Sequence, residues 1–256
     1  MISPNPLKAA LARGEKQIGC WLGLGSPIAT EIIASAGFDW VLVDMEHTSL
    51  SESETVGLLR AVRSVSTIEP LVRVPWNDMV TMKRLLDSGV RSILVPYVQN
   101  ADEARRAAAA TRYPPAGVRG FAGMHRGNDY GRDTSYVHRI ADEIFLAVQA
   151  ESPEAIRNAG AIAAVDGIDC VFVGPNDLAA NMGLLGQPRH PDVLAAIASI
   201  VEPVKAAGKT AGMLDYNIEN SRAWLEAGFD FVAVGSDTAL LAAGAANLVK
   251  AYRQPG

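Results

Sequence analysis

The chain has little cysteine: only Cys20 and Cys170 occur among its 256 residues. Each is flanked by strand-like apolar residues, so we expect two reduced thiols in the core. A disulfide or a cysteine metal pair would be unusual in such a setting. A framework of disulfide bridges is therefore not expected to hold this protein together.

Basic runs and long apolar stretches are also missing. The net charge is −5 and lysines and arginines are scattered, which argues against nucleic acid as a partner. No apolar stretch approaches the length that spans a bilayer, and residues 1–6 lack a charged-then-apolar signal segment. We expect no membrane association and a cytoplasmic location. An acidic protein that binds an anionic substrate must use local groups, so inward-pointing arginines become candidates.

A recurring segment predicts the fold. Ala36-Gly37-Phe38-Asp39-Trp40-Val41-Leu42-Val43-Asp44 reappears as Ala227-Gly228-Phe229-Asp230-Phe231-Val232-Ala233-Val234-Gly235, with looser copies at 88–96 and 166–174. Each glycine is expected to end a helix, and each apolar run to be a strand buried on both faces. A repeated helix-loop-strand unit predicts a parallel sheet.

The elements expected from this pattern fill one domain, residues 1–256. The strands are predicted at 19–24, 40–44, 71–74, 93–96, 144–151, 170–174, 210–214 and 231–235. Helices are predicted between them, at 51–64, 79–88, 101–111, 191–207 and 217–226. Eight such strands indicate a TIM-type (β/α)8 barrel. An open doubly wound sheet is the alternative, but no Gly-x-Gly-x-x-Gly turn follows the first strand.

One segment does not fit the alternation of helices and strands. Residues 117–133 are polar and rich in glycine, and they surround His125 and Arg126. Long irregular loops in globular domains are often functional. The loop is either a lid that contacts substrate or a surface excursion.

Carboxylates at two strand ends predict a metal site. Gln149 and Glu151 are two residues apart on one strand, so they share a face, while Ala150 should face the helices. Asp177 follows the next strand after Gly174-Pro175. Oxygen ligands of this kind suit Mg²⁺ or Mn²⁺. Asp177 could instead cap the following helix, a role that Asn176 could also fill.

Arg73 is predicted to point into the barrel, because it alternates with Val72 and Val74. A buried guanidinium needs an anionic partner. That partner is either an internal carboxylate, Asp44 or Glu46, or a substrate oxygen whose enolate charge Arg73 would stabilise. The two roles are compatible.

His47 is the candidate acid-base group. It follows the strand that ends at Asp44, and a nearby carboxylate fixes an imidazole's tautomer and raises its basicity. Two other mechanisms have weaker support. Schiff-base chemistry lacks an inward lysine at a strand end, and a phosphate cup at 234–237 would contain Asp237, which is better suited to capping a helix.

Taken together, these residues resemble the class II 4-hydroxy-2-oxo-acid (HpcH/HpaI) aldolases over essentially the whole chain. The shared motifs are Ile18-Gly19-Cys20-Trp21, Ala36–Trp40, Asp44–His47, Arg73-Val74-Pro75, Leu85-Leu86-Asp87-x-Gly89, Thr111–Gly120 and Gly174-Pro175-x-Asp177-Leu178. Two departures occur: Ala150 stands where isoleucine is usual, and Asn176 where alanine or serine often precedes the aspartate.

The resemblance implies a barrel that cleaves 4-hydroxy-2-oxo acids to pyruvate and an aldehyde. It implies a divalent metal (Mg²⁺, Mn²⁺ or Co²⁺) held by Glu151 and Asp177, enolate stabilisation by Arg73, and proton transfer by His47 oriented by Asp44. Substrate contacts are implied for the following residues: Trp21, Gln149, Gly174, Asn176, Asp177, Leu214, His125 and Arg126.

Asp87 matches a residue that reaches a neighbouring subunit's site, so the resemblance also implies a homo-oligomer, a hexamer of two trimers. The loop Met124-His125-Arg126 looks more like the 2-dehydro-3-deoxyglucarate branch than the heptanedioate branch. Arg126 would then receive a distal carboxylate. The alternatives are a citrate-lyase-like acyl-CoA lyase, a barrel sugar-phosphate isomerase, and a 2-oxo-acid-binding protein without turnover.

Overall fold

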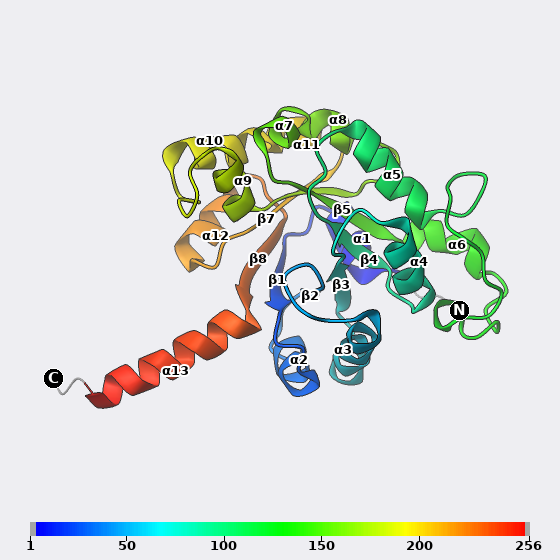
Figure 1. Ribbon diagram of the computed structural model, residues 1–256, viewed down its shortest axis with the longest axis horizontal. Helices are drawn as coiled ribbons and strands as arrows, with labels where there is room; N and C mark the ends of the chain where they lie inside the picture. Colours follow the sequence, from blue (N-terminus) through cyan, green and yellow to red (C-terminus); the bar gives the residue numbers. More distant parts are fainter. Residues whose placement is uncertain (1–3, 254–256) are drawn as a thin grey trace.

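Eight parallel strands close into a barrel, each pairing with the next and β8 pairing back to β1 (Figure 1). The computed structural model describes residues 4–253. The strands are β1 (Gln17–Leu22), β2 (Trp40–Asp44), β3 (Glu69–Arg73), β4 (Ser92–Val95), β5 (Phe145–Ala150), β6 (Cys170–Val173), β7 (Thr210–Leu214) and β8 (Phe231–Ser236). The predicted TIM-type barrel and its eight strands are confirmed, with boundaries shifted by a residue or two.

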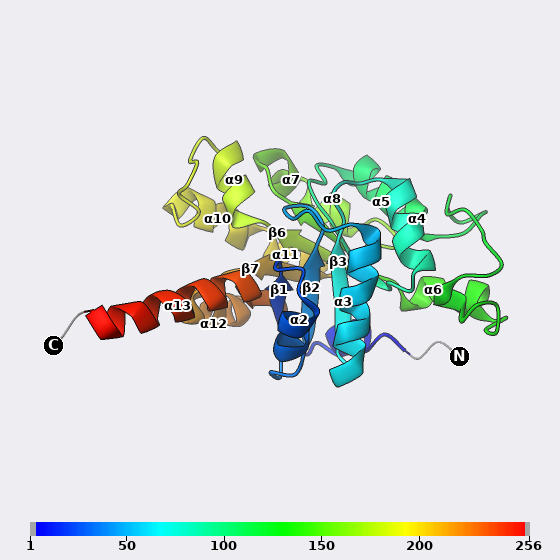
Figure 2. The same cartoon turned by 60° about the horizontal axis from the view of Figure 1, so that its bottom comes forward.

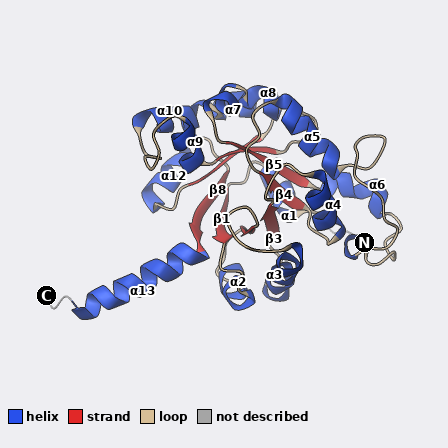
Figure 3. Ribbon diagram, in the orientation of Figure 1, coloured by secondary structure: helices blue, strands red, loops and turns tan. Residues whose placement is uncertain are grey.

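Helices surround the strands (Figure 3). They are α1 (Pro6–Ala12), α2 (Pro27–Ala34), α3 (Glu52–Val65), α4 (Met79–Asp87), α5 (Ala101–Thr111), α6 (Tyr136–Glu143), α7 (Pro153–Arg157), α8 (Ala159–Ala163), α9 (Pro175–Asn181), α10 (Pro191–Ser199), α11 (Val201–Ala206), α12 (Ile218–Glu226) and α13 (Asp237–Arg253). Within residues 4–253, every helix is too short or too polar to cross a bilayer.

The helix predicted at 191–207 is in fact two, α10 and α11, separated at Ile200. Pro203 lies in the first turn of α11, where its missing N–H leaves no helical hydrogen bond unmade. A single continuous helix would have lost that bond in its interior.

The strands are buried on both faces, as expected for a parallel barrel. Trp40, Phe172 and Phe231 fill the interior, and Gly19 leaves the space that the Trp40 ring occupies. Helix α1 contributes Leu7 and Leu11 to the same interior cluster. Because Asn5 bonds Ser92 at the start of β4, α1 closes the end of the barrel where the strands begin. The other end stays open for a site.

Both cysteines are buried free thiols, as expected. Cys20 packs with the helices outside the barrel, whereas Cys170 lies in the interior cluster. Burial raises the pKa of the Cys20 thiol to about 12, which makes it unreactive at neutral pH.

The segment 117–133 is mostly irregular and contains one short 3-10 helix, η1 (Arg126–Asn128). It lies at the side of the barrel, near α4 and α6 (Figure 1). Arg119 anchors it through an ion pair of 2.7 Å with Asp87 of α4. The loop therefore lies beside its own barrel, away from the open end.

The last helix, α13, extends away from the barrel (Figure 2). From Thr238 to Arg253 its residues are exposed, including Leu240, Leu241, Leu248 and Val249. Ile28 and Ile32 on α2 are exposed as well. A leucine-rich helix face and an apolar patch on the barrel thus both lack cover in the single chain.

Candidate active site

A cavity of about 590 Å³ lies at the carboxyl ends of the strands. This is the end at which barrel enzymes place their chemistry. Its lining includes ten of the residues singled out from the sequence: Trp21, Asp44, His47, Arg73, Gln149, Glu151, Gly174, Asn176, Asp177 and Leu214. Residues from distant parts of the chain therefore meet in one place.

Arg73 is held rigidly at the cavity floor. Its Nε and Nη2 donate to the two carboxylate oxygens of Asp44 at 2.9 and 2.7 Å, across the β2–β3 register. Its Nη1 lies 2.9 Å from Oε2 of Glu46, and the guanidinium carbon is 5.3 Å from the ring centre of Trp21. Arg73 therefore pairs with both of the carboxylates that the sequence offered as internal partners, Asp44 and Glu46.

The electrostatics favour a charged pair here. Burial alone would raise the pKa of Asp44, but the hydrogen bonds and charge of Arg73 outweigh it and leave that pKa lowered. Glu46 shows the opposite balance, since burial raises its pKa despite Arg73. The hydrogen bonds to Asp44 use two of the five N–H groups of the Arg73 guanidinium, and the contact with Glu46 is an ion pair. Further N–H groups of Arg73 are therefore available to a ligand.

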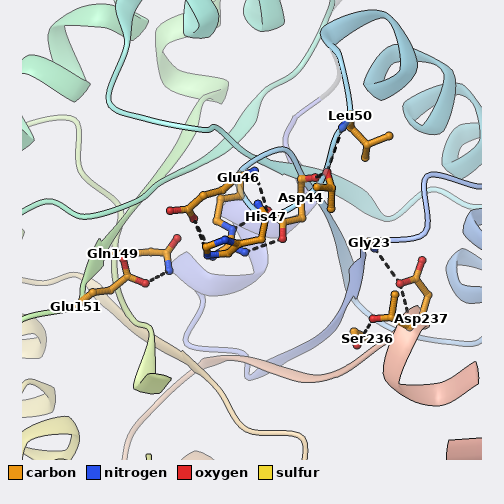
Figure 4. A network of polar contacts seen from close by, with 12 residues as sticks. Gly23, Asp44, Glu46, His47, Leu50, Gln149, Glu151, Ser236 and Asp237 are labelled. Carbon is orange, nitrogen blue, oxygen red and sulfur yellow. Dashed lines mark hydrogen bonds and ion pairs between the residues drawn. The ribbon is translucent and has the colours of Figure 1, made fainter. Parts of the chain in front are cut away.

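Glu151 lines the same cavity as Arg73 and is only 3% exposed. It accepts a hydrogen bond of 2.5 Å from Gln149 and one of 3.2 Å from the backbone of Tyr97. Ala150 packs outward among the helices, as the alternation predicts. Figure 4 shows Gln149 and Glu151 near the loop that carries Asp44, Glu46 and His47.

Burial, together with the nearby charges of Asp177 and Glu46, raises the pKa of Glu151 to about 8. Such a carboxylate is costly to ionise without a cation. Gly174 is required beside it, because a Cβ at that position would overlap Oε1 of Glu151. The Gly174-Pro175 turn thus lets the carboxylate reach the cavity.

Asp177 is exposed and lies in the first turn of α9. The N-cap residue of this helix is Gly174, and no side chain caps it, so the alternative that Asp177 or Asn176 is the N-cap is not what the structure shows. Asp177 still gains from the helix dipole, but its carboxylate remains available to a ligand.

These groups fit a hard divalent cation. Glu151 and Asp177 offer carboxylate oxygens, and Oε1 of Gln149 is buried without a hydrogen-bond partner. Among residues 4–253, no three His, Cys, Asp or Glu side chains gather into a complete metal site. An Mg²⁺-type ion needs few protein ligands when water and substrate oxygens complete its octahedron.

His47 reaches the cavity, but its setting differs from the expectation. Asp44 accepts hydrogen bonds from the backbone N–H groups of Glu46 and His47, at 3.0 and 3.4 Å. The same carboxylate also accepts hydrogen bonds from the guanidinium of Arg73. The carboxylate near the His47 imidazole is that of Glu46, with Nε2 and Oε2 3.9 Å apart. Asp44 thus positions the loop, and the imidazole, 63% exposed, is free to turn toward a ligand.

Three predicted site residues do not line this cavity. Asp87 lies on α4, where it pairs with Arg119, and His125 is 3.8 Å from it. The Nδ1 of His125 accepts the N–H of Asn128 and so caps η1. Arg126 donates to the carbonyl of Ser88 at 2.7 Å. Within one chain, the expected contact of Arg126 with a distal substrate carboxylate is not formed, because the loop packs beside α4.

The cavity also contains residues that sequence reasoning missed: Gly23, Thr48, Tyr216, Ser236 and Thr238. All follow or end a strand, so the rule used for Glu151 and Asp177 would have found them. Asp237 was expected to cap the last helix, yet the hydroxyl of Ser236 accepts the N–H of Ala239 instead. Asp237 binds the backbone of Gly23 and Leu24 and ties the β1 loop to β8.

Comparison with known proteins agrees with this geometry. Residues 17–243 match the family model HpcH/HpaI aldolase/citrate lyase. A 4-hydroxy-2-oxo-heptane-1,7-dioate aldolase of Salmonella dublin is 47% identical over 249 residues, covering 97% of this chain and 94% of the relative. The enzyme of the same name from Salmonella typhi is equally similar, at 47% identity with the same coverage of both chains.

Solved structures give the same result. An HpcH/HpaI aldolase/citrate lyase family protein from Burkholderia cenocepacia superposes with a TM-score of 0.94 at 37% identity, covering 98% of this chain and 100% of the other. An HpcH/HpaI aldolase from Desulfitobacterium hafniense gives 0.88 at 30% identity, with 98% of each chain covered. The chain described here is a member of the HpcH/HpaI aldolase/citrate lyase family, a family of enzymes.

Proposed function

We propose that this enzyme is a metal-dependent pyruvate aldolase that cleaves 4-hydroxy-2-oxo acids, reversibly, to pyruvate and an aldehyde. The observation that carries the proposal is the meeting of Arg73, His47, Glu151 and Asp177 in one cavity at the open end of the barrel. The family uses a divalent metal. For this chain we propose Mg²⁺, Mn²⁺ or Co²⁺, held by Glu151 and Asp177.

The retro-aldol step breaks the C3–C4 bond of the substrate. His47 accepts the proton of the 4-hydroxyl, C4 becomes the carbonyl of the departing aldehyde, and the electron pair of the broken bond passes into the enolate of pyruvate. A remaining N–H of Arg73 donates to the 2-oxo oxygen as negative charge develops there. A bound divalent ion would polarise the same 2-oxo group. A proton returned to C3 completes pyruvate.

The rigid setting of Arg73 suits this role. Asp44 and Glu46 fix its plane before substrate binds, so little reorganisation is needed when charge develops. Gln149 holds Glu151 in the same way. We assign substrate contacts to Trp21, Leu214, Gly174 and Asn176, which line the cavity around these groups.

For the substrate, we propose the 4-hydroxy-2-oxoheptanedioate type, with 2-dehydro-3-deoxyaldarates as the second candidate. The loop at 124–126 favoured the aldarate branch, but it does not line the cavity, and the Salmonella relatives at 47% identity carry the heptanedioate name. Similarity to a citrate lyase β subunit from Mycobacterium tuberculosis, at 18% identity, shows the fold alone. An acyl-CoA lyase therefore has less support.

The test is pyruvate release from a panel of 4-hydroxy-2-oxo acids after chelation, with and without Mg²⁺, Mn²⁺ or Co²⁺. We expect metal to restore cleavage, with the heptanedioate substrate fastest. Undiminished cleavage after chelation would contradict a metal-dependent mechanism. Turnover of acyl-CoA substrates alone would move the assignment to the lyase alternative.

We further propose that the enzyme works as a cytoplasmic homo-oligomer, a hexamer by the resemblance, in which Asp87 faces a neighbouring copy's site. The exposed apolar face of α13 supports self-association, since it has no cover in the single chain. Replacing Leu241 with glutamate should lower the mass found by light scattering. An unchanged mass in that variant would remove this support.

A further inference from the structure

A second cavity, of about 560 Å³, lies at the opposite end of the barrel from the active site. Its lining includes Ser66, Thr67 and Glu69 at the start of β3, and Arg91 just before β4. The active-site residue Arg73 is at the other end of β3. The mechanism proposed above uses none of the residues around this second cavity.

Three arginines from separate elements meet there: Arg63 of α3, Arg91, and Arg126 of η1. Arg63 donates to the carbonyl of Gly89 at 3.3 Å, and Arg126 to that of Ser88 at 2.7 Å. These two carbonyls lie at the C-terminal end of α4, where the helix dipole favours cations. Each bond holds its guanidinium in place.

Gly89 makes this close approach possible. Its φ is +90°, and a Cβ there would lie 2.8 Å from Nη1 of Arg126. Capping α4 uses one N–H of Arg63 and one of Arg126, and each guanidinium carries five. Most donors of both side chains therefore remain unused by the protein contacts described.

The positive charge is not fully compensated. Glu69 pairs with Arg91 at 2.6 Å, and Asp129 pairs with Arg132 at 2.8 Å. Across residues 4–253, no carboxylate forms an ion pair with Arg63 or Arg126. In a protein of net charge −5, such a concentration of cations favours an anionic ligand.

We propose that this cavity binds a small molecule with at least two negative charges on phosphate or carboxylate oxygens, held by Arg63 and Arg126. Guanidinium groups bind both oxyanions through paired N–H donors. The cavity volume suits a small metabolite. Because Gly127, Asp129 and Tyr130 line the same cavity, a bound anion joins the loop 117–133 to the base of the barrel. The site thus differs from the aldolase site in place and in ligand.

The experiment is calorimetric titration of the full-length protein with pyrophosphate and with citrate, at constant ionic strength. Wild type is compared with Arg63→Gln and with a matched control, Arg60→Gln, which removes an exposed arginine on the same helix that is not part of the cavity. The two anions distinguish a phosphate ligand from a carboxylate ligand. Thr67→Asp provides a second test, because it adds negative charge to the exposed rim.

We expect saturable binding of at least one anion to wild type and to Arg60→Gln. Arg63→Gln and Thr67→Asp should each weaken it by about 10-fold or more, since a charge-assisted hydrogen bond is lost or a repulsion gained. Circular dichroism and aldolase turnover should be unchanged, which shows that the variants fold. Equal binding by all four proteins, or no saturable binding of either anion to wild type, would overturn the proposal.

Discussion

Replacing Arg73 with alanine should damage both turnover and stability. The structure shows that Asp44 and Arg73 are almost fully buried, with side-chain exposures of 7% and 8%, and that Glu46 lies beside them. Removing the arginine leaves two carboxylates close together without their cation.

The magnitudes follow from this geometry. Breaking a buried ion pair by removing one partner costs about 3–5 kcal/mol. Separately from stability, kcat should fall by a factor of about 10²–10³, because the enolate oxygen loses an electrostatic partner. A matched control is Arg84→Ala, whose pair with Glu52 is largely exposed and worth at most about 1 kcal/mol.

The pH dependence of unfolding shows whether the lost ion pair with Asp44 causes the loss of stability in Arg73→Ala. The folded-state pKa of Asp44 is lowered, chiefly because Arg73 overcomes the effect of burial, so the pair stabilises the fold above the unfolded-state pKa of the aspartate. That contribution is lost as the pH falls through the folded-state pKa. In Arg73→Ala the penalty should therefore shrink in acid, where the carboxylates are protonated.

Urea unfolding from pH 3 to 8, together with steady-state pyruvate release, measures both effects. A second variant, with Arg73→Met and Asp44→Leu combined, should recover much of the lost stability while staying inactive, because no unpaired charge remains at either position. If Arg73→Ala kept wild-type turnover and unfolded at the same urea concentration as wild type, the assignment of Arg73 would be wrong.

Three further variants test the rest of the site. His47→Ala should lower kcat by about 10²–10⁴ with little change in urea midpoint, because the imidazole is mostly exposed; a large loss of stability would show a structural role. Glu151→Gln should abolish metal-dependent cleavage yet stabilise the metal-free protein. The folded-state pKa of about 8 exceeds the unfolded value, so the gain should grow as the pH rises from about 4.5 to 8, and no gain at pH 8 would contradict it. Gly174→Ala should displace the Glu151 carboxylate and weaken metal binding in calorimetry, and unchanged affinity would refute that packing argument.

Much of the site was predictable from strand alternation and strand ends. Arg73 between two valines, and Gln149 and Glu151 two residues apart, point inward because successive side chains of a strand face opposite sides. The repeated Gly-Phe-Asp segments marked where strands begin. The same rule would have added Tyr216 and Ser236, which lie at or beyond the ends of β7 and β8.

Contacts between distant segments were not predictable in this way. Which carboxylate stands beside the His47 imidazole depends on how the β2 loop folds over Arg73, and the structure gives that place to Glu46. The loop with Arg126 packs on the end of α4, far along the chain from the strand ends. Local sequence patterns do not encode these distances.

The sequence by itself determined the barrel, its eight strands and the inward direction of the residues that line its open end. These follow from periods of two and of 3.6 residues, which are local properties of the backbone. Only the tertiary structure decided that Asp44 pairs with Arg73, that Arg126 and Arg63 line one cavity at the opposite end of the barrel, and that α13 extends away from the barrel. Those outcomes depend on packing and charge pairing between segments that meet only when the chain has folded.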